Sequence, residues 1–317
     1  MAYKEEHIRQ TRRMRETSVS GTGTRRPNGP DFICVGMIKA GTAWLFDQLK
    51  HHPDFWMPPV KEIRYLHDNV PDMLIVQKRL QLYDNAVKTG IARRRDGRDY
   101  RFLREAAALI GHPVNVQAYS SLFRHKRFLL SGDISPIYSR LSDAKVANIA
   151  KVLPNTKILL LVRDPLERAW SGLSMLQRHG KLDVSLLDDA ESFREYYKRA
   201  NKSERFLFPS KIVRRWQQHA PQVAFRYFFF DDIVADPEKT RREILLYLGA
   251  DPEKKSGSLP ASHNRKAEAK KLLMTDEIKT VLVEHFADEL RASAELLGGP
   301  AKMWLERYGL SGTGSLK

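Results

Sequence analysis

A segment near the start of the chain combines residue types that bind a phosphate group. Residues 32–45 read FICVGMIKAGTAWL: an apolar run that predicts a buried strand, then a glycine-containing loop and a helix predicted over 43–50. Backbone N–H groups at a helix start, together with the helix dipole, attract anions. Gly41 lets the backbone approach the anion closely, while Lys39 and Thr42 supply a positive charge and a hydroxyl.

The placement of the lysine argues against ATP as the ligand. Gly36 and Gly41 have the spacing of the nucleoside-triphosphatase pattern GxxxxGK[ST], whose lysine reaches the β- and γ-phosphates. Here Thr42 takes the position of that lysine, and the lysine of this chain lies inside the loop, at residue 39. A kinase using ATP and magnesium, with residues 231–232 ending a metal-binding strand, is therefore the less favoured alternative.

A second segment has the chemistry to hold another phosphate. Residues 162–171 read VRDPLERAWS and follow the clearest apolar run of the chain, a strand predicted over 157–162. Arg163 then lies at the carboxyl end of that strand, where open α/β sheets bind ligands. Asp164 and Pro165 predict a capped helix start, and Ser171 lies two turns into that helix. An arginine and a hydroxyl at this place can grip one phosphate.

Together the two segments resemble the sulfotransferases. The GxxKxGT loop is similar to their 5′-phosphosulfate loop, and VRDPLERAWS contains their 3′-phosphate motif R-[DN]-P-x-x-R-A-x-S at every fixed position. The resemblance implies 3′-phosphoadenosine 5′-phosphosulfate (PAPS) as donor, 3′-phosphoadenosine 5′-phosphate (PAP) as product, and no metal. The donor-binding residues that it implies are Lys39, Ala40, Gly41, Thr42, Ala43, Trp44, Arg163 and Ser171.

The resemblance also suggests a catalytic base. Residues 58–66, PPVKEIRYL, are similar to the K-E-x-x-[FY]-[FL] loop of glycan sulfotransferases, including the heparan sulfate type, whose glutamate serves as base. The match implies Glu62 as base, Lys39 as the group that stabilises the leaving phosphate, and Lys61 as an acceptor contact. Arg64 replaces the family's usual histidine, and Leu66 an aromatic. An exposed Lys–Glu pair without a catalytic role is the alternative.

Three further segments are candidates for the acceptor and donor sites. Residues 131–138, SGDISPIY, resemble the family's G-[ED]-x-S-P-x-Y element, which implies Ser135 and Tyr138 as substrate-binding; a turn packed under the site is the alternative. Arg265 and Lys266 match the basic loop over the 3′-phosphate and adenine, although the glycines that usually follow are absent. The arginine-rich loop 93–98 could attract an anionic acceptor. Solvated loops are the alternative for both basic segments.

The predicted elements define an α/β fold. Strands predicted over 32–35, 157–162 and 223–230 alternate with helices over 43–50, 141–152, 237–248 and 275–297, which favours a parallel sheet flanked by helices. A helical insert over 74–110 interrupts this order. With the resemblance, the prediction is a P-loop-NTPase-like sulfotransferase fold over 31–307, after a disordered basic tail 1–30 and before a flexible tail 308–317.

Composition narrows the partners. The formal net charge of +16 favours anionic partners, but no DNA-binding motif accompanies it, so a nucleic-acid-binding protein is a third, weaker reading. Cys34 is the only cysteine, which excludes an intramolecular disulfide. Without an apolar run of about 18 residues or a secretory signal, a cytoplasmic protein is expected. The predicted acceptor is a hydroxyl, less favourably an amine, of a glycan or glycolipid; a small-molecule or lipid acceptor stays open.

Overall fold

The computed structural model of the protein describes residues 28–89, 97–200, 208–254, 259–263 and 272–311. Most of the predicted N-terminal tail lies outside these residues, as does the end of the C-terminal one. The same holds for the arginine run 93–95 and for Arg265 and Lys266, so their predicted roles stay predictions.

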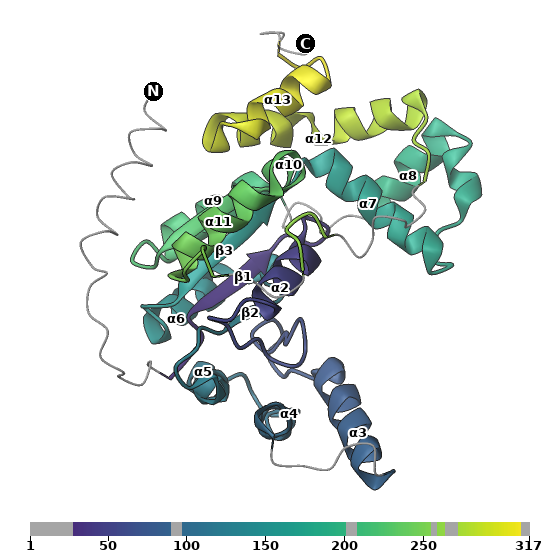
Figure 1. Ribbon diagram of the computed structural model, residues 1–317. Helices are drawn as coiled ribbons and strands as arrows, with labels where there is room; N and C mark the ends of the chain where they lie inside the picture. Colours follow the sequence, from purple (N-terminus) through teal and green to yellow (C-terminus); the bar gives the residue numbers. More distant parts are fainter. Residues whose placement is uncertain (1–27, 90–96, 201–207, 255–258, 264–271, 312–317) are drawn as a thin grey trace.

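A parallel sheet of four strands forms the centre of the described protein (Figure 1). Its spatial order is β2-β1-β3-β4, and each neighbouring pair is parallel. The strands are β1 (Phe32–Gly36), β2 (Gly132–Ile134), β3 (Lys157–Val162) and β4 (Phe225–Phe229). This arrangement confirms the predicted α/β class and its parallel sheet.

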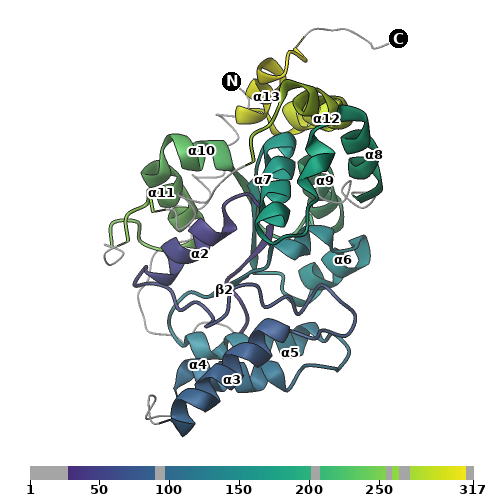
Figure 2. The same ribbon diagram turned by 90° about the vertical axis from the view of Figure 1, so that its right-hand side faces the viewer.

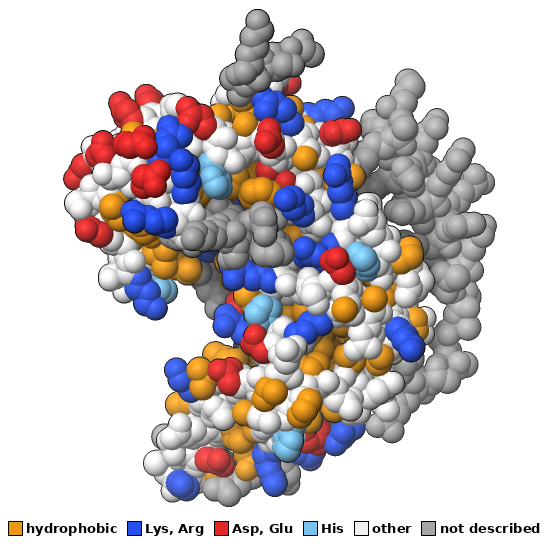
Figure 3. All heavy atoms as spheres, turned by 180° about the vertical axis from the view of Figure 1, so that it is seen from behind, with side chains coloured by type: hydrophobic (Ala, Val, Ile, Leu, Met, Phe, Trp, Pro, Cys, Tyr) orange, Lys and Arg blue, Asp and Glu red, His pale blue; other side chains and the backbone are white. Residues whose placement is uncertain are grey.

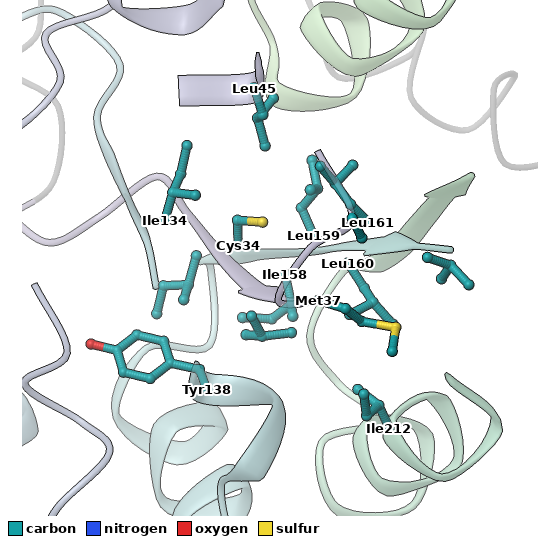
Figure 4. Packing of buried hydrophobic residues seen from close by; sticks show 14 of the residues in the cluster. Cys34, Met37, Leu45, Ile134, Tyr138, Ile158, Leu159, Leu160, Leu161 and Ile212 are labelled. Atoms are coloured by element: carbon teal, nitrogen blue, oxygen red, sulfur yellow. The ribbon is translucent and has the colours of Figure 1, made fainter. Parts of the chain in front are cut away.

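The central strands are buried on both faces, as their apolar sequences predict. All of β1 and all of β3 except Lys157 is buried. Figure 4 shows that Leu159 and Leu161 point to the side of Leu45 on α2 (Thr42–Lys50), whereas Leu160 points to the side of Ile212 on α9 (Pro209–His219). The period-two alternation of side chains therefore joins helices on the two faces into one core.

Strand β2 is short, and sequence reasoning did not find it. Only three residues pair with β1, and one of them is the charged Asp133, so neither length nor apolar content marks a strand. Gly132 is required by close approach: a Cβ there would lie 2.4 Å from the carbonyl oxygen of Phe32. The tight β1–β2 contact brings Asp133 and the residues after it beneath the loop of Glu62.

Helices cover both faces of the sheet. Figures 1 and 2 place α2, α10 and α11 on one face and α6 and α9 on the other, with α3, α4 and α5 in a lobe at one end. The helices are α2 (Thr42–Lys50), α3 (Leu74–Lys88), α4 (Arg98–Ala107), α5 (Val116–Ser121), α6 (Asp143–Val152), α7 (Pro165–Arg178), α8 (Ala190–Ala200), α9 (Pro209–His219), α10 (Phe230–Ala235), α11 (Pro237–Leu248), α12 (Asp276–Leu297) and α13 (Pro300–Arg307).

Helix boundaries follow the local capping chemistry. Helix α11 spans the predicted 237–248, and α6 begins at Asp143 because the Ser142 side chain caps it. The predicted insert 74–110 contains two helices, α3 and α4. The strand predicted over 223–230 is shorter, because the short helix α10 already begins at Phe230. Residues 231–232 therefore lie in its first turn rather than at a strand end.

Asp164 ties the end of β3 to the C-terminal helix. Its Oδ1 accepts hydrogen bonds from the N–H groups of Leu166 (3.0 Å) and Glu167 (3.4 Å) at the start of α7. Its Oδ2 accepts from Arg307 Nη1 at 2.9 Å and from the Tyr308 hydroxyl at 2.8 Å. Asp164 is 1% exposed, and this burial raises the pKa of its carboxyl, although its hydrogen bonds and Arg307 oppose the rise. One buried carboxylate thus orients the segment that carries Arg163.

Replacing Asp164 by alanine should destabilise the fold more than replacing Asp236, its nearest equivalent. Both are helix N-caps followed by proline, but Asp236 is exposed, and among the described residues its side chain accepts from Lys239 N alone. We expect Asp236→Ala to cost about 1 kcal/mol of unfolding free energy. Asp164→Ala should cost about 3 kcal/mol, because it also removes the acceptor of the Tyr308 hydroxyl and the closer of the two carboxylates that pair with Arg307. Urea unfolding of both variants measures the difference, and equal losses would contradict this account of Asp164.

Candidate active site

Helix α2 begins in a way that leaves its first amides available to an anion. Its N-cap is Gly41, which has no side chain to accept from them; side chains cap α6, α7, α11 and α12, whereas α3, α4 and α9 also lack such a cap. The φ of Gly41 is 93°, in the left-handed region that favours glycine, and an added Cβ would lie 3.0 Å from the ring of Phe230. The helix start therefore has the geometry of a phosphate site.

The two predicted phosphate segments meet. Arg163 Nη1 donates to the carbonyl of Lys39 at 3.0 Å, across 124 residues of sequence. The guanidinium carbon lies 4.6 Å from the ring centre of Phe230, and Nη2 donates to Glu167 Oε2 at 3.3 Å. The side chain of Arg163 is only 16% exposed, so it lies inside the site and not on the outer surface. Both segments therefore face a common space at the carboxyl ends of β1 and β3.

The loop of the candidate base approaches the phosphate loop. Lys61 Nζ donates to Thr42 Oγ1 at 3.4 Å and to Glu62 Oε1 at 2.8 Å. The other carboxylate oxygen of Glu62 accepts from Arg64 Nη2 at 2.7 Å. The Glu62 side chain is 29% exposed, which leaves it accessible to a substrate. Lys61 and Glu62 thus form an ion pair, as the alternative interpretation expected, but the pair is half-buried and contacts the phosphate loop through Thr42.

The charge state of Glu62 is set by its neighbours. Burial raises the pKa of its carboxyl, but the positive charges and hydrogen bonds of Lys61 and Arg64 outweigh it, so the pKa lies below its ordinary value of 4.5. Lys39, Glu62 and Arg64 have positive φ angles of 68°, 66° and 63°, which residues with a Cβ seldom adopt. Such strained backbone gathers at functional sites.

A buried carboxylate holds the loop of Glu62 from below. Asp133 Oδ1 accepts from the Ser135 hydroxyl at 2.7 Å and from the N–H of Ile63 at 3.4 Å. Its Oδ2 accepts from the hydroxyls of Tyr138 at 2.7 Å and Tyr119 at 3.1 Å. Burial raises the pKa of Asp133 despite these donors. They form a polar network that replaces water around the carboxylate.

Ser135 and Tyr138 take part in this network from fully buried positions. Their side chains are 0% exposed. The Ser135 hydroxyl accepts from the N–H of Arg64 at 3.0 Å, and the Tyr138 hydroxyl accepts from the N–H of Leu66 at 3.3 Å. Of the two readings of this element, the geometry favours a turn packed under the site over direct contact with an acceptor. Sequence reasoning left Asp133 out of the site, although it stood within the motif.

Two tryptophans hold the ends of the segment that contains Arg265 and Lys266. Trp44 Nε1 on α2 donates to the carbonyl of Ala261 at 2.6 Å, and Trp170 Nε1 on α7 donates to the carbonyl of Leu272 at 2.9 Å. These indoles come from the two phosphate-binding segments. The described flanks of the basic segment are therefore attached directly to the candidate site.

The remaining predicted residues lie on the same elements. Ala40 is buried before the start of α2, Ala43 is half-buried in its first turn, and Ser171 is half-buried on α7. Cys34 is buried in β1 under the loop, and burial raises the pKa of its thiol to about 12, so it stays a protonated core residue. Figure 3 shows the molecule hollowed on one side, between the lobe of α3 and the end that carries α7 and α8, with Lys and Arg side chains around the hollow.

The described residues contain neither a membrane-spanning helix nor a cluster of metal ligands. No helix in the described part of the chain is long and apolar enough to cross a membrane. Within the same residues, no group of three or more His, Cys, Asp or Glu side chains has an arrangement that could hold a metal ion.

Comparison with known proteins identifies the family. The model of the Sulfotransferase family matches residues 30–254, and the chain belongs to that family. A sulfotransferase from Alicyclobacillus acidocaldarius has a similar fold, with a TM-score of 0.59 at 21% identity, covering 87% of this chain and 98% of that one. The sulfotransferase domain of the Synechococcus PCC 7002 olefin synthase gives 0.47 at 16% identity, covering 86% and 98%. No curated protein matches the chain. The predicted family and fold are confirmed; the leaning toward the glycan type stays a prediction.

Tyr138 and Tyr119 offer a matched test of how the loop of Glu62 is held. Both hydroxyls donate to Asp133 Oδ2, but only that of Tyr138 also accepts from a loop amide, that of Leu66. Each Phe variant should lose about 1 kcal/mol of stability. Only Tyr138→Phe should also speed hydrogen exchange at the Leu66 amide beyond the general change. If Tyr119→Phe speeds that amide equally, the specific role of Tyr138 is wrong.

Proposed function

We propose that this sulfotransferase moves a sulfuryl group from PAPS to a hydroxyl, less favourably an amine, of a carbohydrate-containing acceptor. A small-molecule or lipid acceptor is the alternative. The hydrogen bond from Arg163 to the carbonyl of Lys39 carries the donor assignment. It joins the two candidate phosphate-binding segments, which supports a nucleotide with phosphates at both its 5′ and 3′ positions.

The residues around this space fit such a nucleotide. The uncapped start of α2 and the side chains of Lys39 and Thr42 suit the 5′-phosphosulfate, because amides, an ammonium and a hydroxyl all interact with anionic oxygens. Arg163 and Ser171 suit the 3′-phosphate. Trp44 and Trp170 hold the flanks of the segment with Arg265 and Lys266, which supports a donor-binding role for that segment too.

Glu62 is the proposed base. It takes the proton of the acceptor hydroxyl while the acceptor oxygen forms a bond to sulfur and the bond from sulfur to the 5′-phosphate oxygen breaks. The products are the sulfated acceptor and PAP, and the proton stays on Glu62 until solvent removes it. Lys39 stabilises the negative charge that develops on the leaving phosphate. Lys61, which contacts both Thr42 and Glu62, joins the donor side to the acceptor side.

Arg163→Gln should weaken PAP binding about 10- to 100-fold, since a hydrogen bond to a charged group contributes about 1.5–3 kcal/mol. Arg215→Gln is the matched control: that guanidinium also donates to a backbone carbonyl, of Ser139, and to a carboxylate, of Asp143. The measurement is the rise in melting temperature that PAP, or ATP with magnesium, causes in the parent protein and in both variants. Stronger stabilisation of the parent by ATP and magnesium would favour a kinase and overturn the proposal.

Arg64→Met should move the acidic limb of the pH profile of kcat/KM to higher pH. Glu62 acts as base only when it is deprotonated, and the positive charge of Arg64 helps to hold its pKa below 4.5. Removing that charge raises the pKa of Glu62, so Glu62 becomes protonated, and the rate falls, at a higher pH. The measurement uses labelled PAPS and an acceptor found by screening sugars, glycolipids and phenols.

Glu62→Gln is the companion variant in the same assay. Its rate should fall by about 10²- to 10⁴-fold, the usual contribution of a general base, with PAP binding retained. Glu62 would not be the base if Glu62→Gln had the normal rate, or if the acidic limb of the pH profile did not move in Arg64→Met. Neither outcome would affect the assignment of PAPS as donor.

A further inference from the structure

Helix α3 presents an apolar face that the rest of the described protein does not cover. Leu74, Ile75 and Leu82 are 56%, 46% and 60% exposed. Their spacing of seven and eight residues places them on one side of the helix. The opposite side packs inward, with Val76 buried and Leu80 against the core. A helix anchored by one apolar side normally has a polar outer side, so this exposure requires an explanation.

Two cations lie within the same face. Lys78 is four residues after Leu74 and four before Leu82, and Arg79 is four after Ile75; both are exposed. We define the α3 face as Leu74, Ile75, Lys78, Arg79 and Leu82. No acidic residue belongs to it: Asp72 precedes the helix, and Asp84 accepts from the Tyr100 hydroxyl on the side of α4. Apolar and cationic side chains thus share one surface.

The α3 face is not a general property of this protein's surface. Other large exposed apolar residues, such as Val234, Leu246 and Met303, lie singly on the separate helices α10, α11 and α13. Figures 1 and 2 place α3 on the outside of its lobe, away from the sheet. The sequence from 70 to 130, which includes this lobe, has twelve Lys and Arg against five Asp and Glu, so it carries +7 of the net +16.

We propose that the α3 face docks on the surface of an anionic lipid bilayer, with the helix lying in the headgroup region. Leucine and isoleucine side chains can enter the acyl boundary while Lys78 and Arg79 extend their long stems and pair with lipid phosphates. An apolar groove of a folded protein would have to bury those two charges without such partners. A positively charged lobe adds long-range attraction to an anionic membrane. This inference is independent of the proposed donor, base and acceptor.

Vesicle binding by the full chain tests the proposal. We expect co-sedimentation with vesicles of phosphatidylcholine and phosphatidylglycerol, weak co-sedimentation with phosphatidylcholine alone, and loss of binding in high salt. The variant Leu74→Gln/Leu82→Gln, which keeps good helix formers, should lose most of the binding. Lys78→Gln and Arg79→Gln should each weaken binding about fivefold, since one cation near such a surface contributes about 1 kcal/mol.

Helix α11 supplies the matched control, because Leu246 is 54% exposed and Lys239 is exposed on it. The variant Lys239→Gln/Leu246→Gln should bind anionic vesicles like the parent, and thermal melting should show that all variants are folded. Equal binding of the α3 and α11 variants, or no vesicle binding by the parent, would overturn the proposal. If the parent protein self-associates in sedimentation experiments and only the α3 variants do not, then the α3 face binds a second copy of the chain and the lipid proposal is wrong.

Discussion

The parallel pairing of β1 with β3 is the constraint on which the candidate site depends. The strands run in register from Phe32 opposite Lys157 to Cys34 opposite Leu159, and the register then shifts, so that Gly36 pairs with Leu160. The amide of Met37 still donates to the carbonyl of Leu161, at 2.8 Å. Two loops consequently leave the sheet at the same level, which is why the side chain of Arg163 reaches the carbonyl of Lys39.

Buried carboxylates then orient the loops that the sheet brings together. Asp164 caps α7 and binds Arg307 and Tyr308, while Asp133 accepts from three hydroxyls and the Ile63 amide under the loop of Glu62. A buried carboxylate is costly unless donors surround it, so each one favours a single arrangement of the groups that satisfy it. In this protein those groups include the backbone beside Arg163 and Glu62, and their precise placement is what group transfer needs.

The α3 lobe follows a different physical logic from the site. Near the sheet, donors surround the carboxylates of Asp133 and Asp164 and the apolar side chains are buried. The α3 face instead leaves apolar and cationic side chains together in contact with solvent. Exposed apolar side chains do not stabilise the fold of the free protein, but they can enter the apolar interior of a lipid bilayer while the cations pair with its anionic headgroups. The proposed nucleotide site therefore lies at the carboxyl ends of the sheet strands, and the proposed docking surface lies apart from it, on helix α3.

The sequence by itself determined those features that depend on neighbouring residues. Apolar runs predicted β1 and β3, and Asp164 with Pro165 predicted the start of α7, because strands and caps depend on residues close in sequence. The phosphate-binding role of the motifs around Lys39 and Arg163 stays a prediction. The family resemblance that these motifs carried was confirmed by the match over residues 30–254. Glu62 remains a prediction whose geometry is favourable.

Only the tertiary structure decided which distant groups meet. Strand β2 was invisible in the sequence, since three residues including Asp133 become a strand only by pairing with β1. Ser135 and Tyr138 looked like acceptor contacts, but the fold buries them under the loop that they hold. These outcomes depend on packing across 70 or more residues, as between Arg64 and Ser135 or between Leu66 and Tyr138. No local pattern encodes such distances, because they arise from how the helices and loops close over the sheet.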